Sequence, residues 1–245
     1  QKVEKNLQVA EQTLAQSSKL AALGEMSAAV SHELNQPLAA MKTYLAGAKL
    51  LLQRKRLDEA LSSFQRIDDL IGRMGAITRQ LKSYARKGGE DLVAVDVRMA
   101  VNGALEIMEP QLKSRQTSLA KTLPSAPVMI LGDQLRLEQV VVNLLRNALD
   151  ATSAVQTPEI ELLLLGGGTA SLTVRDNGEG ISDLDDLFEP FFTTKKPGDG
   201  VGLGLAISSG IITDLGGRLV ARNSETTGAV FEVTLPILNK DNSEV

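Results

Sequence analysis

The sequence contains no cysteine and no tryptophan, and His32 is its one histidine. Without cysteine, neither disulfide bonds nor thiolate metal sites can form, and one histidine excludes a multi-histidine metal site. No apolar run approaches the roughly 20 residues of a membrane-spanning helix, and no signal peptide is recognisable. Aromatic residues are scarce, with five Phe and two Tyr, so the core must be mainly aliphatic.

A strongly basic surface is also missing, since the formal net charge is −4 and neither sign forms a long block. We therefore expect no nucleic-acid partner. The apolar fraction of 43% and the length of 245 residues suit a globular protein of two domains. The chain begins at Gln1, without Met and inside a helical pattern, so we expect it to be part of a longer protein.

The first 90 residues have helical periodicity. Residues 1–20 repeat apolar or small side chains about every 3.5 residues, which predicts a coiled coil, with an ordinary amphipathic helix as the alternative. The pattern then continues to about Leu52, and Pro37 should bend this helix. After a basic connector, we expect Asp58 to cap a second helix. A lone hairpin cannot close a core, so we predict that residues 21–88 dimerise as a four-helix bundle.

Residues 89–245 have a different rhythm, in which short strands alternate with helices. Strands are predicted at 117–123, 128–131, 159–165, 170–175, 218–223 and 229–235, and helices at 96–108, 133–153 and 205–215. This order indicates an α+β sandwich with helices on one face of a mixed sheet.

The first motif with chemical potential surrounds His32, in the sequence Ser-His-Glu-Leu-Asn-Gln-Pro-Leu. His32 shares a polar stripe of its helix with Gln36, so we expect the imidazole to be exposed. Neutral imidazole is nucleophilic, and histidine with its unperturbed pKa of about 6.5 is mostly neutral at pH 7. Glu33 is adjacent and can accept a proton from one ring nitrogen while the other attacks. The alternative is a histidine without a chemical role.

The second motif carries Asn143 and Asn147, which are four residues apart and lie on one face of a predicted helix. Carboxamide oxygens ligate hard cations such as Mg²⁺, which also binds nucleotide phosphates. Arg146 can meet a phosphate. Two asparagines on a helix can also be capping or solvent-facing residues.

Glycines punctuate the long loop that follows. Residues 176–180, Asp-Asn-Gly-Glu-Gly, come directly after a strand, and the Asp176 carboxylate can accept a hydrogen bond from an adenine amino group. This sequence is also an acceptable turn. Residues 200–205, Gly-Val-Gly-Leu-Gly-Leu, open a helix whose free N–H groups can hold phosphate. Their late place in the chain disfavours a dinucleotide-binding fold. Between them, residues 188–195 contain phenylalanines that can fix a mobile loop, and a lysine that can touch phosphate.

In this order, the motifs resemble the boxes of sensor histidine kinases: an H box at His32, an N box at 143–151, and glycine boxes around Asp176 and at 200–205, with an F box between them. The resemblance covers about residues 20–236. The sequence around His32 is most similar to the C4-dicarboxylate sensor kinases.

The resemblance implies a coiled-coil signalling helix at 1–20, a dimerisation and histidine phosphotransfer domain at 21–88, and an ATP-binding domain of the gyrase and MutL type at 89–245. It implies a homodimer that uses ATP and Mg²⁺. It also implies transfer of the phosphoryl group from His32 to an aspartate of a response regulator, for this subfamily a sigma-54 activator. The chain would be the cytoplasmic portion of a bacterial sensor, anchored in the inner membrane only through upstream segments.

The resemblance also implies roles for individual residues. His32, Glu33 and Gln36 are the implied catalytic residues, Asn147 and Asn143 the metal ligands, and Asp176 the adenine reader. The implied cofactor-binding residues are Asn143, Arg146, Asn147, Asp150, Asp176, Gly178, Gly180, Ile181, Phe191, Thr194, Lys195, Gly200, Gly202, Leu203, Gly204 and Leu205.

Two positions depart from the family pattern. Related kinases often have Asn or Thr four residues after the histidine, where it positions water for hydrolysis of the regulator's phosphoaspartate, whereas this chain has Gln36, which leaves phosphatase activity open. The last glycine motif, residues 228–231, reads Gly-Ala-Val-Phe and lacks the hydroxyl residue often found second.

Three alternatives belong to other functional classes. A hydrolytic ATPase of the gyrase or MutL kind would need a carboxylate one turn before the magnesium asparagine, where this chain has Asn143. A non-catalytic dimeric scaffold would bind nucleotide without phosphorylation. A DNA-binding module would need a recognition motif, which we do not find.

Overall fold

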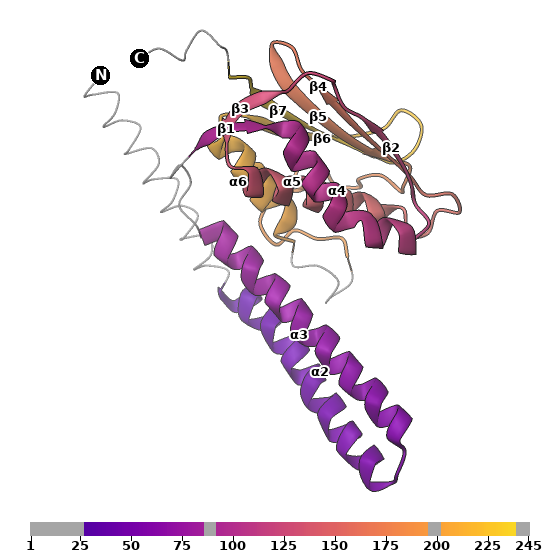
Figure 1. Cartoon of the computed structure of the whole chain (residues 1–245). Coiled ribbons are helices and arrows are strands. Elements are labelled where there is room, and N and C mark those ends of the chain that lie inside the picture. The colour runs from indigo at the N-terminus through magenta and orange to yellow at the C-terminus, as the bar shows by residue number, and fades with distance from the viewer. Residues whose placement is uncertain (1–26, 86–91, 196–201, 239–245) are drawn as a thin grey trace, which may run out of the picture. The chain divides into compact units, whose positions relative to one another are not determined.

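The computed structural model describes residues 27–85, 92–195 and 202–238 (Figure 1). The chain divides into two compact units, Gln1–Lys87 with Phe191–Leu203, and Gly88–Pro190 with Gly204–Val245. The coiled coil predicted for residues 1–20 lies outside the described residues. No helix within the described ranges is long and apolar enough to cross a membrane.

The first unit contains a hairpin of two long helices, α2 (Ser27–Gln53) and α3 (Leu57–Ala85), which lie side by side. Helix α2 runs without a break through Pro37, which is buried. The prediction that Asp58 caps the second helix is wrong, because α3 begins at Leu57 and Asp58 lies inside its first turn. An acidic residue there still interacts favourably with the positive end of the helix dipole.

The hairpin leaves many large apolar side chains on its surface. They are Leu38, Leu45, Leu50, Leu52, Leu57, Leu61, Phe64 and Ile71. Two antiparallel helices can bury only the stripe along which they touch, so this surface is available to a second hairpin. It is consistent with the predicted four-helix bundle.

The second unit is built on a five-stranded sheet with the strand order β2-β4-β5-β7-β6. The strands are β2 (Ser118–Thr122), β4 (Glu159–Leu165), β5 (Thr169–Asp176), β6 (Arg218–Asn223) and β7 (Ala229–Pro236). Strand β2 runs parallel to β4, and the other neighbours are antiparallel.

Three helices cover one face of this sheet (Figure 1). They are α4 (Val97–Ser114), α5 (Gln134–Ala151) and α6 (Gly204–Asp214). Strand β4 shows why the layers form, because Ile160, Leu162 and Leu164 are buried while Glu159 and Glu161 are exposed. This period of two gives the sheet one apolar face for the helices. The predicted α+β sandwich with a mixed sheet is confirmed.

One strand escaped the sequence prediction. Strand β1 (Val93–Asp96) pairs antiparallel with β3 (Met129–Gly132) in a separate two-stranded sheet. Strand β1 has only four residues, and Val93 and Ala94 are both exposed, so it does not show the alternation of buried and exposed residues that predicts a strand.

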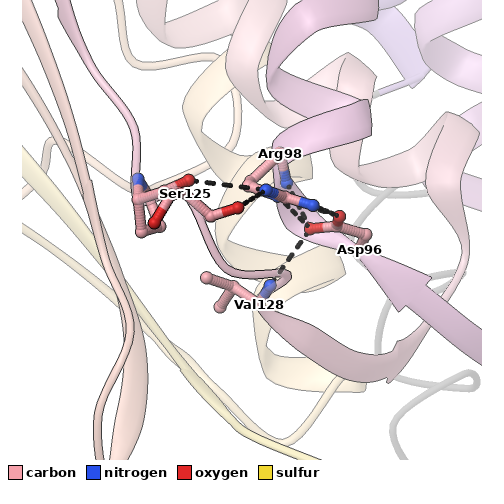
Figure 2. A network of polar contacts seen from close by, with 5 residues as sticks. Asp96, Arg98, Ser125 and Val128 are labelled. Carbon is pink, nitrogen blue, oxygen red and sulfur yellow. Dashed lines mark hydrogen bonds and ion pairs between the residues drawn. The ribbon is translucent and has the colours of Figure 1, made fainter.

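Asp96 joins this small sheet to the helical layer (Figure 2). Its Oδ1 accepts hydrogen bonds from the N–H groups of Arg98 (3.1 Å) and Val128 (3.1 Å), so it caps α4 and holds the start of β3. The Arg98 guanidinium pairs with the carboxylate at 2.7 Å and donates to the carbonyl of Ser125. Burial raises the pKa of Asp96, but the hydrogen bonds from Arg98 and Val128 outweigh burial and hold this pKa below its usual range.

Replacing Asp96 by Ala removes a helix cap and the bond to Val128, so we expect the free energy of unfolding to fall by about 2 kcal/mol. Because the folded pKa is lowered, the contribution of Asp96 is present above its unfolded pKa and is lost as the pH falls through the folded value. Urea unfolding should therefore show the largest difference from the wild type near pH 7 and a shrinking difference below about pH 4.

Glu109→Ala on the same helix provides the control, because its ion pair with Lys113 is exposed. We expect it to be nearly neutral. An Asp96→Ala variant as stable as Glu109→Ala would contradict the assigned role.

Candidate functional site

Asn143 links two helices of the second unit. It lies on α5 and is 8% exposed, and its Nδ2 donates to the carbonyl of Gly204 (3.3 Å) and to Ser208 Oγ (3.2 Å), both on α6. A carbonyl can only accept, so the nitrogen of the amide must face Gly204 and Oδ1 must point away from it. The predicted metal ligand therefore has a structural bond on one side and an oxygen available on the other.

The other predicted α5 residues follow on successive turns. Asn147 is half-buried and makes a polar interaction, whereas Arg146 is exposed. Asp150 is half-buried, and its Oδ1 lies 3.3 Å from Nη1 of Arg115. The same Nη1 donates to the carbonyl of Leu149 at 2.8 Å. Arg115, which the sequence analysis did not single out, thus ties the C-terminal end of α4 to that of α5.

Asp176 ends β5 as a buried carboxylate, 3% exposed. Its Oδ1 accepts hydrogen bonds from the N–H groups of Gly178 (2.9 Å) and Ala229 (3.2 Å). No donor among the described residues reaches Oδ2. Oδ2 is also not enclosed by protein, because the one enclosed side-chain atom without a partner among the described residues is Thr117 Oγ1, in another part of the unit. Oδ2 therefore remains available to a ligand. Burial raises the pKa of Asp176, and the two backbone hydrogen bonds only partly oppose this.

Two glycines allow the backbone to approach Asp176 and α5. Gly228 has a φ of +83°, and a Cβ there would lie 1.9 Å from the Asp176 carbonyl oxygen. A Cβ on Gly178 would lie 2.6 Å from the carbonyl oxygen of Ala151, at the end of α5. No larger side chain fits either space. Both positions therefore require glycine because protein backbone approaches closely there.

Two asparagine side chains anchor the beginning of the loop after β5. The Asn177 amide accepts from the N–H of Glu159 (2.9 Å) and donates to the carbonyl of Thr157 (2.8 Å). The Asn223 amide accepts from the N–H of Ile181 (2.7 Å) and donates to its carbonyl (2.9 Å). Gly180, half-buried with a φ of +80°, makes the turn between them. Asn223 was not predicted as a partner of this loop, although Asn at a strand end often bonds to exposed backbone.

The segment Phe191–Leu203 belongs to the first unit and is closed at its base. The N–H of Phe191 donates to the carbonyl of Gly202 at 2.9 Å, and a Cβ on Gly202 would lie 2.4 Å from the carbonyl carbon of Phe191. Thr194 is exposed, and Lys195 is half-buried with a polar interaction. Gly200 lies outside the described residues. Further on, Leu203 is buried, and Leu205 on α6 is half-buried.

The predicted catalytic residues lie on α2, in the first unit. The side chains of His32 and Glu33 lie outside the described part of the structure, so their predicted exposure stays a prediction. Gln36, one turn later, is half-buried and makes a polar interaction.

The donor set decides which cation the second unit could hold. No group of three or more His, Cys, Asp or Glu side chains suited to a metal occurs among the described residues. An all-carboxylate calcium site and a zinc site therefore have no support in that part of the chain. Carboxamide oxygens on one helical face do fit Mg²⁺, which needs few protein ligands when it also binds phosphates.

Two family models match the chain. Residues 132–239 match the histidine kinase-, DNA gyrase B- and HSP90-like ATPase family, so the second unit carries an ATPase domain of this class. Residues 22–90 match the His Kinase A (phospho-acceptor) domain. The chain therefore belongs to the sensor histidine kinases and contains their catalytic core, which confirms the resemblance stated from the motifs.

Known proteins resemble this chain over most of its length. The chain is 39% identical over 240 residues to the C4-dicarboxylate transport sensor protein DctB of Pseudomonas aeruginosa, and the match covers 96% of this chain but 39% of that relative. The histidine kinase ThkA, solved in complex with response regulator TrrA, is 22% identical with a TM-score of 0.69, covering 95% of this chain and 67% of that chain. Full-length ShkA in complex with AMPPNP is 26% identical with a TM-score of 0.60, covering 88% and 46%.

Because burial raises the pKa of Asp176, the free energy of unfolding should depend on pH. With a folded pKa above the unfolded one, the favourable contribution is present below the unfolded pKa and is lost as the pH rises through the folded value. At pH 7 the buried carboxylate therefore lowers the free energy of unfolding. Asp176→Asn keeps an oxygen for Gly178 and Ala229 without the charge, so we expect its ligand-free form to be at least as stable as the wild type at pH 7.

Thermal unfolding between pH 4 and pH 8 would measure this difference. The wild type should lose stability relative to Asp176→Asn as the pH rises. Parallel curves for the two proteins would refute the assigned cost of burial.

Proposed function

We propose that this chain autophosphorylates His32 with Mg-ATP and passes the phosphoryl group to an aspartate of a response regulator. The observation that carries the proposal is the open oxygen of buried Asp176, in one chain with the α5 asparagines and a phospho-acceptor helix. The AMPPNP complex of ShkA and the regulator complex of ThkA support the two ligands.

Asp176 recognises the base in this proposal. Its Oδ2 accepts a hydrogen bond from the exocyclic amino group of adenine, while Oδ1 stays on Gly178 and Ala229. Guanine has a carbonyl at the corresponding position, which would face the carboxylate unfavourably. Ile181 and Gly180 contribute the adjacent backbone, and Asp150 and Arg146 lie at the α5 side of the nucleotide.

The triphosphate needs charge neutralisation. Asn147 and Asn143 would hold Mg²⁺ through their side-chain oxygens, and the ion would offset the negative charge of the phosphates. Backbone N–H groups at the start of α6 donate to phosphate oxygens in this proposal. A positive charge from Lys195 and contacts from Phe191, Thr194, Gly200, Gly202, Leu203, Gly204 and Leu205 are part of the proposal as predictions from the sequence.

Phosphoryl transfer to His32 is a direct in-line displacement. One ring nitrogen bonds to the γ-phosphorus as the bond to the ADP oxygen breaks, and Glu33 accepts the proton from the other nitrogen. Phosphoryl transfer through a loose transition state depends mainly on positioning, so the protein's main task is to bring the two groups into line. Gln36, one turn after His32, occupies the position at which related kinases have Asn or Thr to position water against the regulator's phosphoaspartate, and the proposal includes no phosphatase activity.

The assembly follows from the same proposal. A second copy covers the exposed apolar surface of the hairpin, giving a homodimer with a four-helix bundle. The domains are a coiled coil at 1–20, a dimerisation and phosphotransfer domain at 21–88, and an ATP-binding domain at 89–245. Since this chain spans 39% of its DctB relative, we propose that segments upstream anchor it in a bacterial inner membrane and sense the signal. The regulator is a sigma-54 activator.

The hydrolytic alternative is opposed by Asn143. A carboxylate at this position would activate water, but an amide is not a base at neutral pH. Its nitrogen is also engaged by Gly204 and Ser208, which leaves only Oδ1 for the nucleotide side.

Incubation with Mg²⁺ and γ-labelled ATP tests the proposal. We expect the wild type to acquire an acid-labile, alkali-stable label and His32→Gln to acquire none, because that label requires a phosphorylated imidazole. Asn147→Ala should lower the rate at least about tenfold, the order of a lost phosphate-charge interaction in phosphoryl transfer. ATP binding without any label on the wild type would support the scaffold function instead.

A further inference from the structure

Ser208 is a polar side chain in an apolar place. It lies on α6 among the buried residues Ala206, Ile207, Ile211 and Ile212, and its own exposure is 0%. A buried hydroxyl is unfavourable unless it forms a hydrogen bond. Its partner across the interface of α5 and α6 is Nδ2 of Asn143, at 3.2 Å.

Together with Gly204, Ser208 fixes the amide plane of Asn143. The two acceptors are four residues apart on α6, so they lie on the face of that helix that meets α5. The two hydrogens of an amide nitrogen match two acceptors, which orients the group and directs Oδ1 away from α6. No donor among the described residues reaches Oδ1, so its orientation is set only from the nitrogen side.

An ion pair keeps α6 in place for this contact. Arg136, near the start of α5, lies 2.6 Å from the carboxylate of Asp214 at the end of α6, and both side chains are about one-fifth exposed. The pair fixes the C-terminal end of α6 against α5, while Asn143 fixes its beginning. The distance between Ser208 and Asn143 is therefore held from both ends.

We propose that Ser208 is a positioning residue for the magnesium-bound nucleotide. The Gly204 carbonyl selects the amide nitrogen, and Ser208, by accepting a second hydrogen bond from Nδ2, fixes the amide plane so that the Asn143 oxygen stays directed toward the cation. This inference rests on the proposed role of Asn143 and Asn147 as the magnesium ligands. Without Ser208, Nδ2 keeps only the Gly204 carbonyl, so the amide plane is held at one point and Oδ1 is no longer fixed in the position that faces the cation.

The test compares nucleotide affinity with and without the metal. A fluorescent ATP analogue is titrated into the full chain in EDTA and in saturating Mg²⁺, and the ratio of the two dissociation constants is measured. For Ser208→Ala we expect the EDTA value to stay within about twofold, and the tightening by Mg²⁺ to fall about fivefold, the equivalent of one hydrogen bond. A defect in folding alone would weaken both titrations equally.

Two further variants separate the hydrogen bond from packing. Ser208→Cys fills nearly the same volume with a much weaker acceptor, so it should behave like Ser208→Ala and also replaces it if the alanine variant does not fold. Ser209→Ala removes the neighbouring hydroxyl, which is only half-buried, and should match the wild type.

The outcomes distinguish this inference from the proposed function. If Mg²⁺ does not tighten binding to the wild type, the magnesium role of the asparagines fails and the inference fails with it. If Mg²⁺ tightens the wild type, and Asn143→Ala loses this effect while Ser208→Ala and Ser208→Cys keep it, the proposed function stands and Ser208 has no positioning role. Equal weakening in EDTA and Mg²⁺ would also overturn the inference, because it indicates packing.

Discussion

The second unit depends on one buried carboxylate. Asp176 lies at the end of a central strand, where a charge is costly, and two backbone N–H groups are its described hydrogen-bond donors. To bring them there, the chain must turn at Gly178 and pass over Asp176 at Gly228, in positions where no Cβ fits. The ends of β5, β7 and α5 are therefore fixed together by the residue that we propose to read adenine. Burial of Asp176 is unfavourable, but it places Oδ2 where the fold supplies no donor and a ligand can bind.

Asn143 repeats this division between fold and ligand. Its nitrogen holds the start of α6, and its oxygen is left for the nucleotide side. Residues of this kind affect stability and binding together, so a loss of activity on substitution does not identify their role. Binding measured with and without metal, or stability measured against pH, separates the two contributions because each varies only one of them.

The sequence predicted what depends on neighbours along the chain. Strands β4 and β6 have their predicted bounds because alternating apolar residues end at glycine, proline or polar turns, and α5 begins after Asp133, which caps it. The same reasoning failed for β1, whose partner β3 is distant in sequence. It also failed for Asp58, which lies inside the first turn of α3 and not before it. The contacts of Ser208 and Asn223 were not predictable, since no local pattern reports a partner more than 40 residues away.

The proposed function requires transfer to His32 to be favoured over hydrolysis of ATP. Asp176 and the α5 asparagines belong to the second unit, whereas His32 belongs to the first, so in the proposed function the phosphoryl acceptor comes from another unit than the residues that read the base and hold the metal ion. ATP that is bound before the acceptor is in line must resist attack by water. A carboxylate at position 143 would activate water during this time, whereas an amide held through its nitrogen leaves an oxygen that can ligate the proposed Mg²⁺ and cannot act as a base. A kinase that waits for a protein nucleophile needs charge stabilisation at the phosphate and no base beside it, and in the proposed function the α5 asparagines meet both needs.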